Sequence, residues 1–368
     1  MAGGVAAVDA NHDRSDLDAP LAPGSWVSDP PLRIIPHAEI PLSRPVLPGC
    51  PVREHLFKTA CQQPVALSVT NPAVCTLILN FNRRADTLAC LASLHAEPVE
   101  GNQIIVLDVA STDGSVDAIR AAYPALEVIP LHENRGYAGN NNVGISVALE
   151  RGAEWVFVLN EDTVLAPDCL RRLLAAGRAD PRIGVVGPKV LHADDPHVIQ
   201  SAGGQLDRHW EPSHAGMNEM DAGQWDTPRR VPHISGCAIL VRTEAIRRAG
   251  MLDEEFFCYW EETEWCIRLD RAGYSAWVEP AARLWHKGVQ RNYQPSPAVV
   301  YYFTRNRLLA LSKLRAPLTV RAFAQLQTVR TIASYTLRPK WRHKGADLRA
   351  MRRGLADFWA GHLGKGTW

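Results

Sequence analysis

Short apolar runs alternate with stretches of helical pattern between residues 75 and 176. Buried strands are short and apolar throughout. In an amphipathic helix, apolar residues recur every three or four positions and form one face. The expected strands are Cys75–Leu79, Gln103–Leu107, Leu126–Pro130 and Trp155–Leu159. The expected helices are Arg84–His95, Thr112–Ala122, Ala138–Arg151 and Pro167–Ala176. This alternation predicts an α/β fold with a mostly parallel central sheet that helices cover on both faces.

The pattern changes in the second half of the chain. Ser235–Val241 predicts a further strand, and Glu261–Ala272 predicts a helix behind the aromatic and acidic stretch Asp253–Trp260. Three more stretches predict a C-terminal helical section, namely Pro297–Leu314, Val320–Leu337 and Asp347–Leu363. Residues 1–70 lack sustained periodicity and are rich in Pro, Asp and Ala, so we expect an extended or partly disordered segment with a short strand around Val65–Val69. The expected domains are therefore residues 1–70, 71–290 and 291–368.

Composition adds little except through the distribution of charge. Hydrophobic residues make up 46% of the 368 residues, which is typical of a globular chain, and the formal net charge is +1. Between Arg305 and Arg353, however, thirteen Lys and Arg residues stand against one acid, Asp347. This bias predicts an anionic partner, either a membrane surface or a phosphate-bearing acceptor, although a solvated basic face or an oligomer interface would show it too. No nucleic-acid partner is expected.

The expected cellular location depends on three sequence signals: a signal peptide, a membrane-spanning helix and a paired-cysteine motif. No basic region followed by an apolar stretch opens the chain, and the longest uncharged run, Thr59–Asn82, is too polar for a spanning helix. The eight cysteines form no CxxC motif, which favours free thiols in a reducing compartment over a zinc site. We therefore expect a cytoplasmic protein that touches the inner face of the membrane peripherally.

Polar residues follow several of the expected strands at their carboxyl ends, where open α/β sheets bind ligands. Glu161 and Asp162 follow one strand and could hold a divalent cation, because Mg²⁺ prefers one or two carboxylates plus phosphate oxygens. Capping of the helix near Pro167 is the simpler alternative. Asp108 ends another strand and could face a ligand, while the following Ser, Thr and Asp residues cap the next helix.

Two further segments carry candidate chemistry. Residues 134–144 form a glycine-containing turn that opens a helix, a place that attracts phosphate, but no GxGxxG motif marks a dinucleotide-binding dehydrogenase. Glu261, Glu262 and Glu264 open a helix behind five aromatic or apolar residues. Glu264 is explained by an i,i+4 pair with Arg268, whereas partial burial of the other two would raise their pKa and suit a general base. A role for His286 is left open.

Taken in order, these segments resemble the family 2 glycosyltransferases, and in particular their bacterial rhamnosyltransferase-like branch. The resemblance covers roughly residues 75–288 and is weaker in Tyr301–Arg307. The matching segments are Thr76–Asn82 (TLILNFN), Asp108–Ser115 (DVASTDGS), Asn134–Gly144 (NRGYAGNNNVG), Leu159–Thr163 (LNEDT), Ser235–Arg242 (SGCAILVR) and Phe256–Arg268 (FFCYWEETEWCIR). Six motifs in this order make a specific signal.

The resemblance implies a GT-A fold and an inverting glycosyltransferase that uses Mg²⁺ or Mn²⁺. Asp162 would hold the metal, and Glu262 falls at the position of the catalytic base. Four residues would bind the nucleotide-sugar donor, namely Asn82, Asp108, Ser111 and Gly136. The acceptor would be a saccharide, a lipid-linked saccharide or a small metabolite, and rhamnose is the sugar that the branch suggests.

Three positions depart from the family pattern. Val109 replaces the usual Asn after Asp108, Asn140 replaces a usual Gly, and Glu262 stands where the base is usually Asp. The first two put the donor nucleotide in doubt, and the third lengthens the base by one methylene. Two alternatives therefore stay open: a non-catalytic relative that binds nucleotide sugars, and a nucleotidyltransferase, although Asn80–Arg84 lacks the glycines of a phosphate loop.

Overall fold

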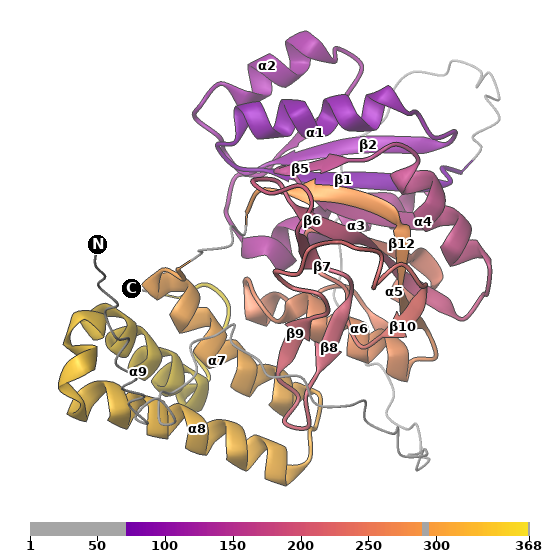
Figure 1. Ribbon diagram of the computed structural model, residues 1–368. Coiled ribbons are helices and arrows are strands. Elements are labelled where there is room, and N and C mark those ends of the chain that lie inside the picture. The colour runs from indigo at the N-terminus through magenta and orange to yellow at the C-terminus, as the bar shows by residue number, and fades with distance from the viewer. Residues whose placement is uncertain (1–70, 289–293, 367–368) are drawn as a thin grey trace, which may run out of the picture. The chain divides into compact units, whose positions relative to one another are not determined.

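The computed structural model describes residues 71–288 and 294–366. The predicted segment 1–70, with its strand around Val65–Val69, lies outside these residues. Within them, a large sheet runs in the order β10-β12-β6-β11-β4-β1-β2-β3, with β5 paired to β12 and β7 to β6 (Figure 1). Its strands are β1 (Val74–Asn80), β2 (Asn102–Asp108), β3 (Glu127–Pro130), β4 (Trp155–Asn160), β5 (Thr163–Leu165), β6 (Ile183–His192), β7 (Ile199–Ser201), β10 (Arg229–Val231), β11 (Ala238–Arg242) and β12 (Ser275–His286).

Most strands of this sheet point the same way, as expected. The pairs β1–β2, β1–β4, β2–β3 and β6–β12 are parallel, whereas β11 runs antiparallel to both β4 and β6, and β10 antiparallel to β12. It follows that β1, β2, β3, β4, β6 and β12 share one direction and end at one edge of the sheet. A separate hairpin joins β8 (Gly204–Leu206) to β9 (Pro212–His214).

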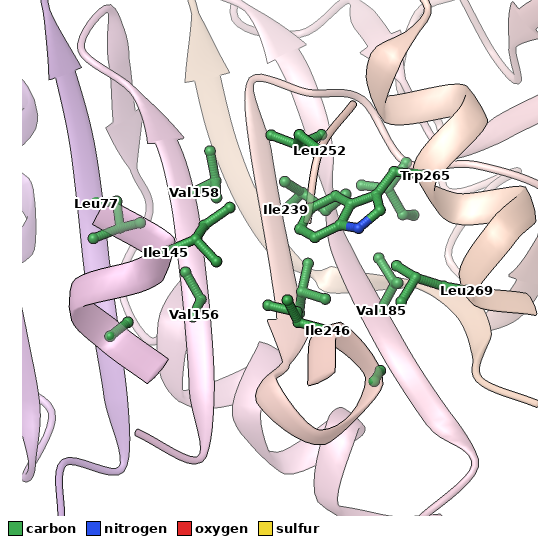
Figure 2. Packing of buried hydrophobic residues seen from close by; sticks show 14 of the residues in the cluster. Leu77, Ile145, Val156, Val158, Val185, Ile239, Ile246, Leu252, Trp265 and Leu269 are labelled. Carbon is green, nitrogen blue, oxygen red and sulfur yellow. The ribbon is translucent and has the colours of Figure 1, made fainter. Parts of the chain in front are cut away.

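Helices cover both faces because side chains alternate along each strand. Leu77 of β1 packs into one buried cluster with α3 (Gly136–Glu150), α5 (Thr243–Ala249) and α6 (Glu261–Arg271), and Trp265 lies at its centre (Figure 2). The next residue, Ile78, packs into a second cluster with α1 (Arg84–Ala96), α2 (Ser115–Ala122) and α4 (Cys169–Arg178). The sheet is thus the middle layer of three.

The C-terminal section is helical, as the pattern predicts. It contains α7 (Pro297–Lys313), α8 (Leu318–Leu337), a short 3-10 helix η2 (Pro339–Lys344) and α9 (Gly345–Ala360). Ser296 and Pro297 explain where α7 begins, because the Ser296 hydroxyl accepts from the Val299 N–H at 3.4 Å and proline needs no N–H partner at a helix start. Among the described helices, none is both long and apolar enough to cross a bilayer.

The sequence pattern missed β6 and most of β12. β6 contains two glycines, Pro188 and Lys189, which usually interrupt strands. Pro188 is tolerated because the register of β12 shifts between Glu279 and Arg283, directly opposite it. Lys189 is fully buried and pairs with Asp221 at 2.8 Å and with Asp226. Long-range partners therefore override the local signal here.

Two predicted helices begin later than expected. α2 begins at Ser115 and not at Thr112, because the Asp113 carboxylate accepts from the Ser115 N–H at 3.0 Å and Gly114 turns with φ 77°. α4 begins at Cys169 after Asp168, which has φ 62°. Both changes lengthen the loops that follow β2 and β5.

Candidate active site

The candidate site lies along the edge where the parallel strands end. β1 ends at Asn80, β2 at Asp108, β4 at Asn160 and β12 at His286. The antiparallel strand β11 begins at this edge, because Ala238 pairs with Leu159 and the Asn160 N–H donates to the Cys237 carbonyl at 2.9 Å. The predicted residues are thus gathered at one edge, as the strand pattern required.

Asn80, Asp108 and Ser111 form one hydrogen-bonded group. The Asn80 side-chain amide donates to Asp108 Oδ1 at 2.6 Å and to Ser111 Oγ at 3.1 Å, and the Ser111 N–H donates to Asp108 Oδ2 at 3.1 Å. Asn82 joins the group through its N–H, which donates to Ser111 Oγ at 3.0 Å. The carboxylate of Asp108 is therefore held in one orientation and still has lone pairs for further donors.

Asp162 and His286 face one another at the next position along the edge. Asp162 Oδ1 lies 3.2 Å from His286 Nε2, and both residues are buried. The other ring nitrogen, His286 Nδ1, lies 2.7 Å from Gln200 Oε1. A ring protonated on both nitrogens donates to Gln200 Oε1 and to Asp162 Oδ1. If Nε2 is not protonated, its lone pair and the carboxylate can share a bound cation instead.

The space in front of this pair is kept open by Gly288. A Cβ atom there would lie 2.9 Å from Asp162 Oδ2 and 2.9 Å from His286 Nε2, closer than real Cβ atoms come to such neighbours. Burial alone would raise the pKa of Asp162, but the hydrogen bond and charge of a protonated His286, together with the charge of Arg83, outweigh it and the pKa is lowered. The neighbouring Glu161 has its pKa raised to about 7, chiefly by burial, with a further contribution from Asp162. At neutral pH, Asp162 is the carboxylate that stays ionised.

A second group of carboxylates lies at the start of α6. A Cβ atom on Gly236 would lie 3.6 Å from Glu262 Cγ and 3.3 Å from the Tyr137 hydroxyl. That hydroxyl donates to the Gly236 carbonyl at 2.5 Å. Glu262 is partly exposed, whereas Glu261 is buried and its Oε2 has no hydrogen-bond partner among the described residues. Only Glu262 is open to an incoming molecule.

Burial raises the pKa of both glutamates, and the charge of Glu262 adds to the effect on Glu261. The third acid, Glu264, is structural as expected: it forms two contacts with Arg268, at 2.8 and 2.9 Å. The two groups of carboxylates share a neighbour in Cys237, whose pKa is raised to about 12 by burial and also by the charges of Asp162 and Glu262. Asp162 and Glu262 therefore both lie near the start of β11.

The loop before α6 has an unusual backbone. Phe257, Tyr259 and Trp260 all have positive φ, at 66°, 68° and 78°, which costs free energy in residues with a side chain. The Asn306 side-chain amide donates to the carbonyls of Phe256, Cys258 and Tyr259 at 2.9, 2.7 and 2.9 Å. Arg305 donates to the Phe256 carbonyl at 3.0 Å, and both residues are fully buried. The strained loop is thus held from α7.

Gly136 lies against this aromatic loop and not beside the Asn80 group. Its φ is +76°, and a Cβ atom would lie 2.2 Å from the Phe257 carbonyl oxygen. Only glycine fits such a position. A structural reason for the glycine is therefore present, and its expected contact with the donor stays a prediction.

The two departures in the donor region have local explanations. Val109 is buried in the cluster that contains Leu77 and Trp265. Asn140 holds the turn before α3, because its Oδ1 accepts from the Arg135 N–H at 3.1 Å and its amide donates to Asn134 Oδ1 at 3.2 Å. Neither residue disrupts the Asn80 group.

Sequence reasoning missed four residues of the site and left His286 undecided. Tyr137 and Gly236 lie inside recognised motifs, so their place could have been suspected. Gln200 and Gly288 carry no local signal, since Gln200 meets His286 from 86 residues away. Only the pairing of β12 with β5 and β6 brings His286 to the edge.

Comparisons with known proteins point to the family that the sequence motifs resemble. Residues 75–248 match the model of the family described as "Glycosyl transferase family 2". N-acetylglucosaminyl-diphospho-decaprenol L-rhamnosyltransferase of Mycobacterium tuberculosis is 29% identical over 226 residues, which are 56% of this chain and 73% of that protein. The dTDP-rhamnosyl transferase RfbF of Shigella flexneri is 24% identical over 276 residues, 72% of this chain and 90% of that protein.

A solved structure shares the fold. GalNAc-T7, crystallised with UDP, GalNAc and Mn²⁺, superposes with a TM-score of 0.52 at 15% sequence identity. The match covers 66% of this chain and 48% of that one, so this chain spans about half the length of GalNAc-T7. The GT-A fold expected from the resemblance is thereby confirmed.

Proposed function

We propose that residues 75–248, which match the family 2 glycosyltransferase model, form a catalytic domain of that family. The chain would transfer a sugar from a nucleotide-diphosphate donor to an acceptor hydroxyl with inversion at the anomeric carbon. The observation that carries this proposal is the placement of Glu262 and the Asp162–His286 pair around the start of β11. One carboxylate is open and has a raised pKa, and the other is buried, ionised and paired with an imidazole. The first environment suits proton transfer from the acceptor hydroxyl. The second suits binding of the donor diphosphate through a metal ion.

The donor would bind across the strand ends. Asp108, already oriented by Asn80 and Ser111, would accept hydrogen bonds from the base or ribose of the nucleotide. Asn82 and Gly136 are proposed to line the same pocket. Because the Asp108 carboxylate is fixed before the donor arrives, binding loses little side-chain entropy at this point.

We propose that Asp162 and His286 hold a divalent cation, Mg²⁺ or Mn²⁺. The Asp162 carboxylate is the kind of donor that both ions prefer, Gln200 orients the imidazole, and the glycine at 288 leaves the space free. Such an ion, when bound, would act as a Lewis acid on the diphosphate leaving group. The contribution of the protein is to place the Asp162 carboxylate and His286 Nε2 3.2 Å apart at this space.

Glu262 would act as the general base. Its position at the first turn of α6, beside Gly236 and Tyr137, leaves its carboxylate accessible, and a raised pKa makes it a better proton acceptor from a hydroxyl. The acceptor hydroxyl would lose its proton to Glu262 as its oxygen attacks the anomeric carbon. The bond to the nucleotide diphosphate breaks on the opposite side of that carbon, which inverts the configuration.

The names of the relatives supply the first substrates to test, an L-rhamnosyl nucleotide as donor and a polyprenyl-diphosphate-linked saccharide as acceptor. A screen of nucleotide sugars for binding and transfer, with Mg²⁺ or Mn²⁺ and with excess EDTA, tests the proposal. We expect one donor to bind and to be turned over only with acceptor. Donor binding without turnover on any acceptor would favour the non-catalytic alternative.

The metal site is tested by three variants. Asp162→Ala and His286→Ala should abolish turnover, and Gly288→Ala should weaken Mn²⁺ binding because its Cβ would enter the space between the two side chains. Gly345→Ala is the control, since its Cβ would meet nothing nearer than Arg349 at 3.8 Å. Mn²⁺ affinity is measured by calorimetry in the presence of the nucleoside diphosphate. Full turnover in EDTA, or in Asp162→Ala, would contradict the metal role.

A further inference from the structure

Helix α8 has two apolar faces, and only one of them is buried. Val320 and Ala324 pack into a cluster with Leu308 and Leu311 of α7. On the other side, six exposed residues recur at intervals of three or four, and we call them the outer stripe: Leu318, Ala322, Leu326, Val329, Ala333 and Leu337. Leu318, Leu326 and Leu337 are 78%, 67% and 77% exposed, which is unusual for three leucines on one helix.

The outer stripe is narrow and continuous. At about 100° per residue, its six positions fall within an arc of about 100°, and the twenty residues of α8 give a length of about 30 Å. Figure 1 shows α8 at the lower edge of the helical section, with α7 and α9 above it. Helix α8 contains no Asp or Glu. The outer stripe therefore carries no negative charge, and the exposed Thr319 and Thr336 lie at its two edges.

Basic residues border the stripe. On the same helical projection, Arg330 falls about 20° beyond one edge of the stripe and Arg321 about 60° beyond the other. Exposed basic side chains continue beyond the end of α8, on η2 and α9: Arg338, Lys340, Arg342, Arg349 and Arg352. Between residues 315 and 353 the one acid is Asp347, which pairs with Lys344 at 3.2 Å.

An apolar stripe edged by arginines matches the surface of an anionic bilayer. Apolar side chains of such a helix enter the boundary between headgroups and acyl chains, while the arginines extend to the phosphates. A second copy of this chain is a poorer match, because its α8 carries the same arginines and no Asp or Glu to pair with them. A helix of this hydropathy cannot span the bilayer.

We propose that α8 lies on an anionic membrane surface, with the outer stripe in the interface and the basic residues of α8, η2 and α9 on the lipid phosphates. Membrane binding through α8 does not depend on the proposed transferase activity.

The experiment is flotation of the full chain with vesicles of phosphatidylcholine alone or with 30% phosphatidylglycerol. We expect binding to the anionic vesicles that weakens steeply between 50 and 500 mM salt. The double variant Leu326→Gln/Val329→Gln should bind about tenfold more weakly. Arg330→Gln/Arg342→Gln should lose roughly fivefold per arginine at low salt.

Met220→Gln is the matched control, because Met220 is 61% exposed and lies outside the C-terminal helices. It should bind vesicles as the unchanged protein does, and circular dichroism should show that all variants fold. Equal binding to neutral vesicles, or no effect of the stripe variant, would overturn the proposal. A dimer in analytical ultracentrifugation that Leu326→Gln/Val329→Gln dissociates, without vesicle binding, would assign the stripe to a second copy instead.

Discussion

Glu261 and Glu262 are neighbours on α6, and their side chains point about 100° apart. Glu262 lies beside Gly236 at the open edge of the sheet, whereas Glu261 is buried with one oxygen lacking a hydrogen-bond partner among the described residues. From the sequence, helix geometry and the family resemblance favour Glu262 as the base, and this assignment stays a prediction. The contact of Glu262 with Gly236 was beyond sequence reasoning, since it depends on how β11 meets α6.

Glu262→Gln should lower kcat by about 10²–10⁴-fold, because the amide keeps the shape but cannot accept the proton. Donor affinity, measured by calorimetry, should change little, since the proposed donor contacts are elsewhere. Glu261→Gln is the adjacent control and should retain most of the turnover. If Glu262→Gln worked at the normal rate, Glu261 would become the first alternative base.

The pH dependence of the rate should report the raised pKa of Glu262. A base acts when ionised, and burial raises its pKa above the ordinary 4.5. The rate should therefore fall as pH drops through a value above 4.5, earlier than for an exposed glutamate. A kcat/KM profile of the unchanged enzyme should show this acid limb. Residual activity of Glu262→Gln should lack it.

Glu261 should affect stability in the opposite sense to a salt-bridged acid. Burial, and then the charge of Glu262, raise its pKa well above 4.5 in the folded state. Below pH 4.5 the side chain is neutral in both states, and as pH rises the unfolded chain ionises first, so the folded state loses relative stability. Glu261→Gln should thus raise the Tm of the ligand-free protein at pH 7–8, with the difference vanishing near pH 4. A Tm gain independent of pH would contradict this account.

At the scale of elements, the aromatic loop before α6, residues 256–260, is held in place by α7. The loop carries three residues of positive φ directly before Glu261, and Asn306 and Arg305 hold its carbonyls. The sequence showed the two segments only as separate motifs, Phe256–Arg268 and Tyr301–Arg307. Their contact joins residues about 50 positions apart, which no local pattern records.

Asn306→Ala should remove the donor to three carbonyls, cost about 1–3 kcal/mol of stability and lower kcat at saturating donor. The kcat loss follows because the loop sets the direction of the first turn of α6. Leu308→Ala is the control: Leu308 is buried in α7 but points into another cluster, and its truncation should cost about 2–5 kcal/mol. Thermal unfolding and turnover measurements distinguish the two variants. At temperatures below its Tm, Leu308→Ala should have the kcat of the unchanged protein, whereas Asn306→Ala should not.

At the scale of the molecule, the helical section and the sheet domain should unfold together. Arg305 and Asn306 are fully buried against the loop, Lys313 pairs with Asp253 at 2.5 Å, and Arg307 pairs with Glu211 at 2.6 Å. The domain boundary expected at residue 290 falls between segments that these contacts join. Calorimetry of the full chain should show one transition for residues 71–366. Two well-separated transitions would mean that the contacts contribute little.

The position of β12 in the chain has a consequence for synthesis. β6 is a central strand, yet one of its partners, β12, begins about 80 residues after β6 ends. At 5–20 residues per second, the ribosome leaves that edge of β6 without its partner for roughly 4–16 s. An unpaired apolar edge is a template for wrong association during this interval. Slower translation of residues 193–274 should therefore increase the demand for chaperones. His286 lies at the end of β12, so it reaches the site only when the sheet is complete.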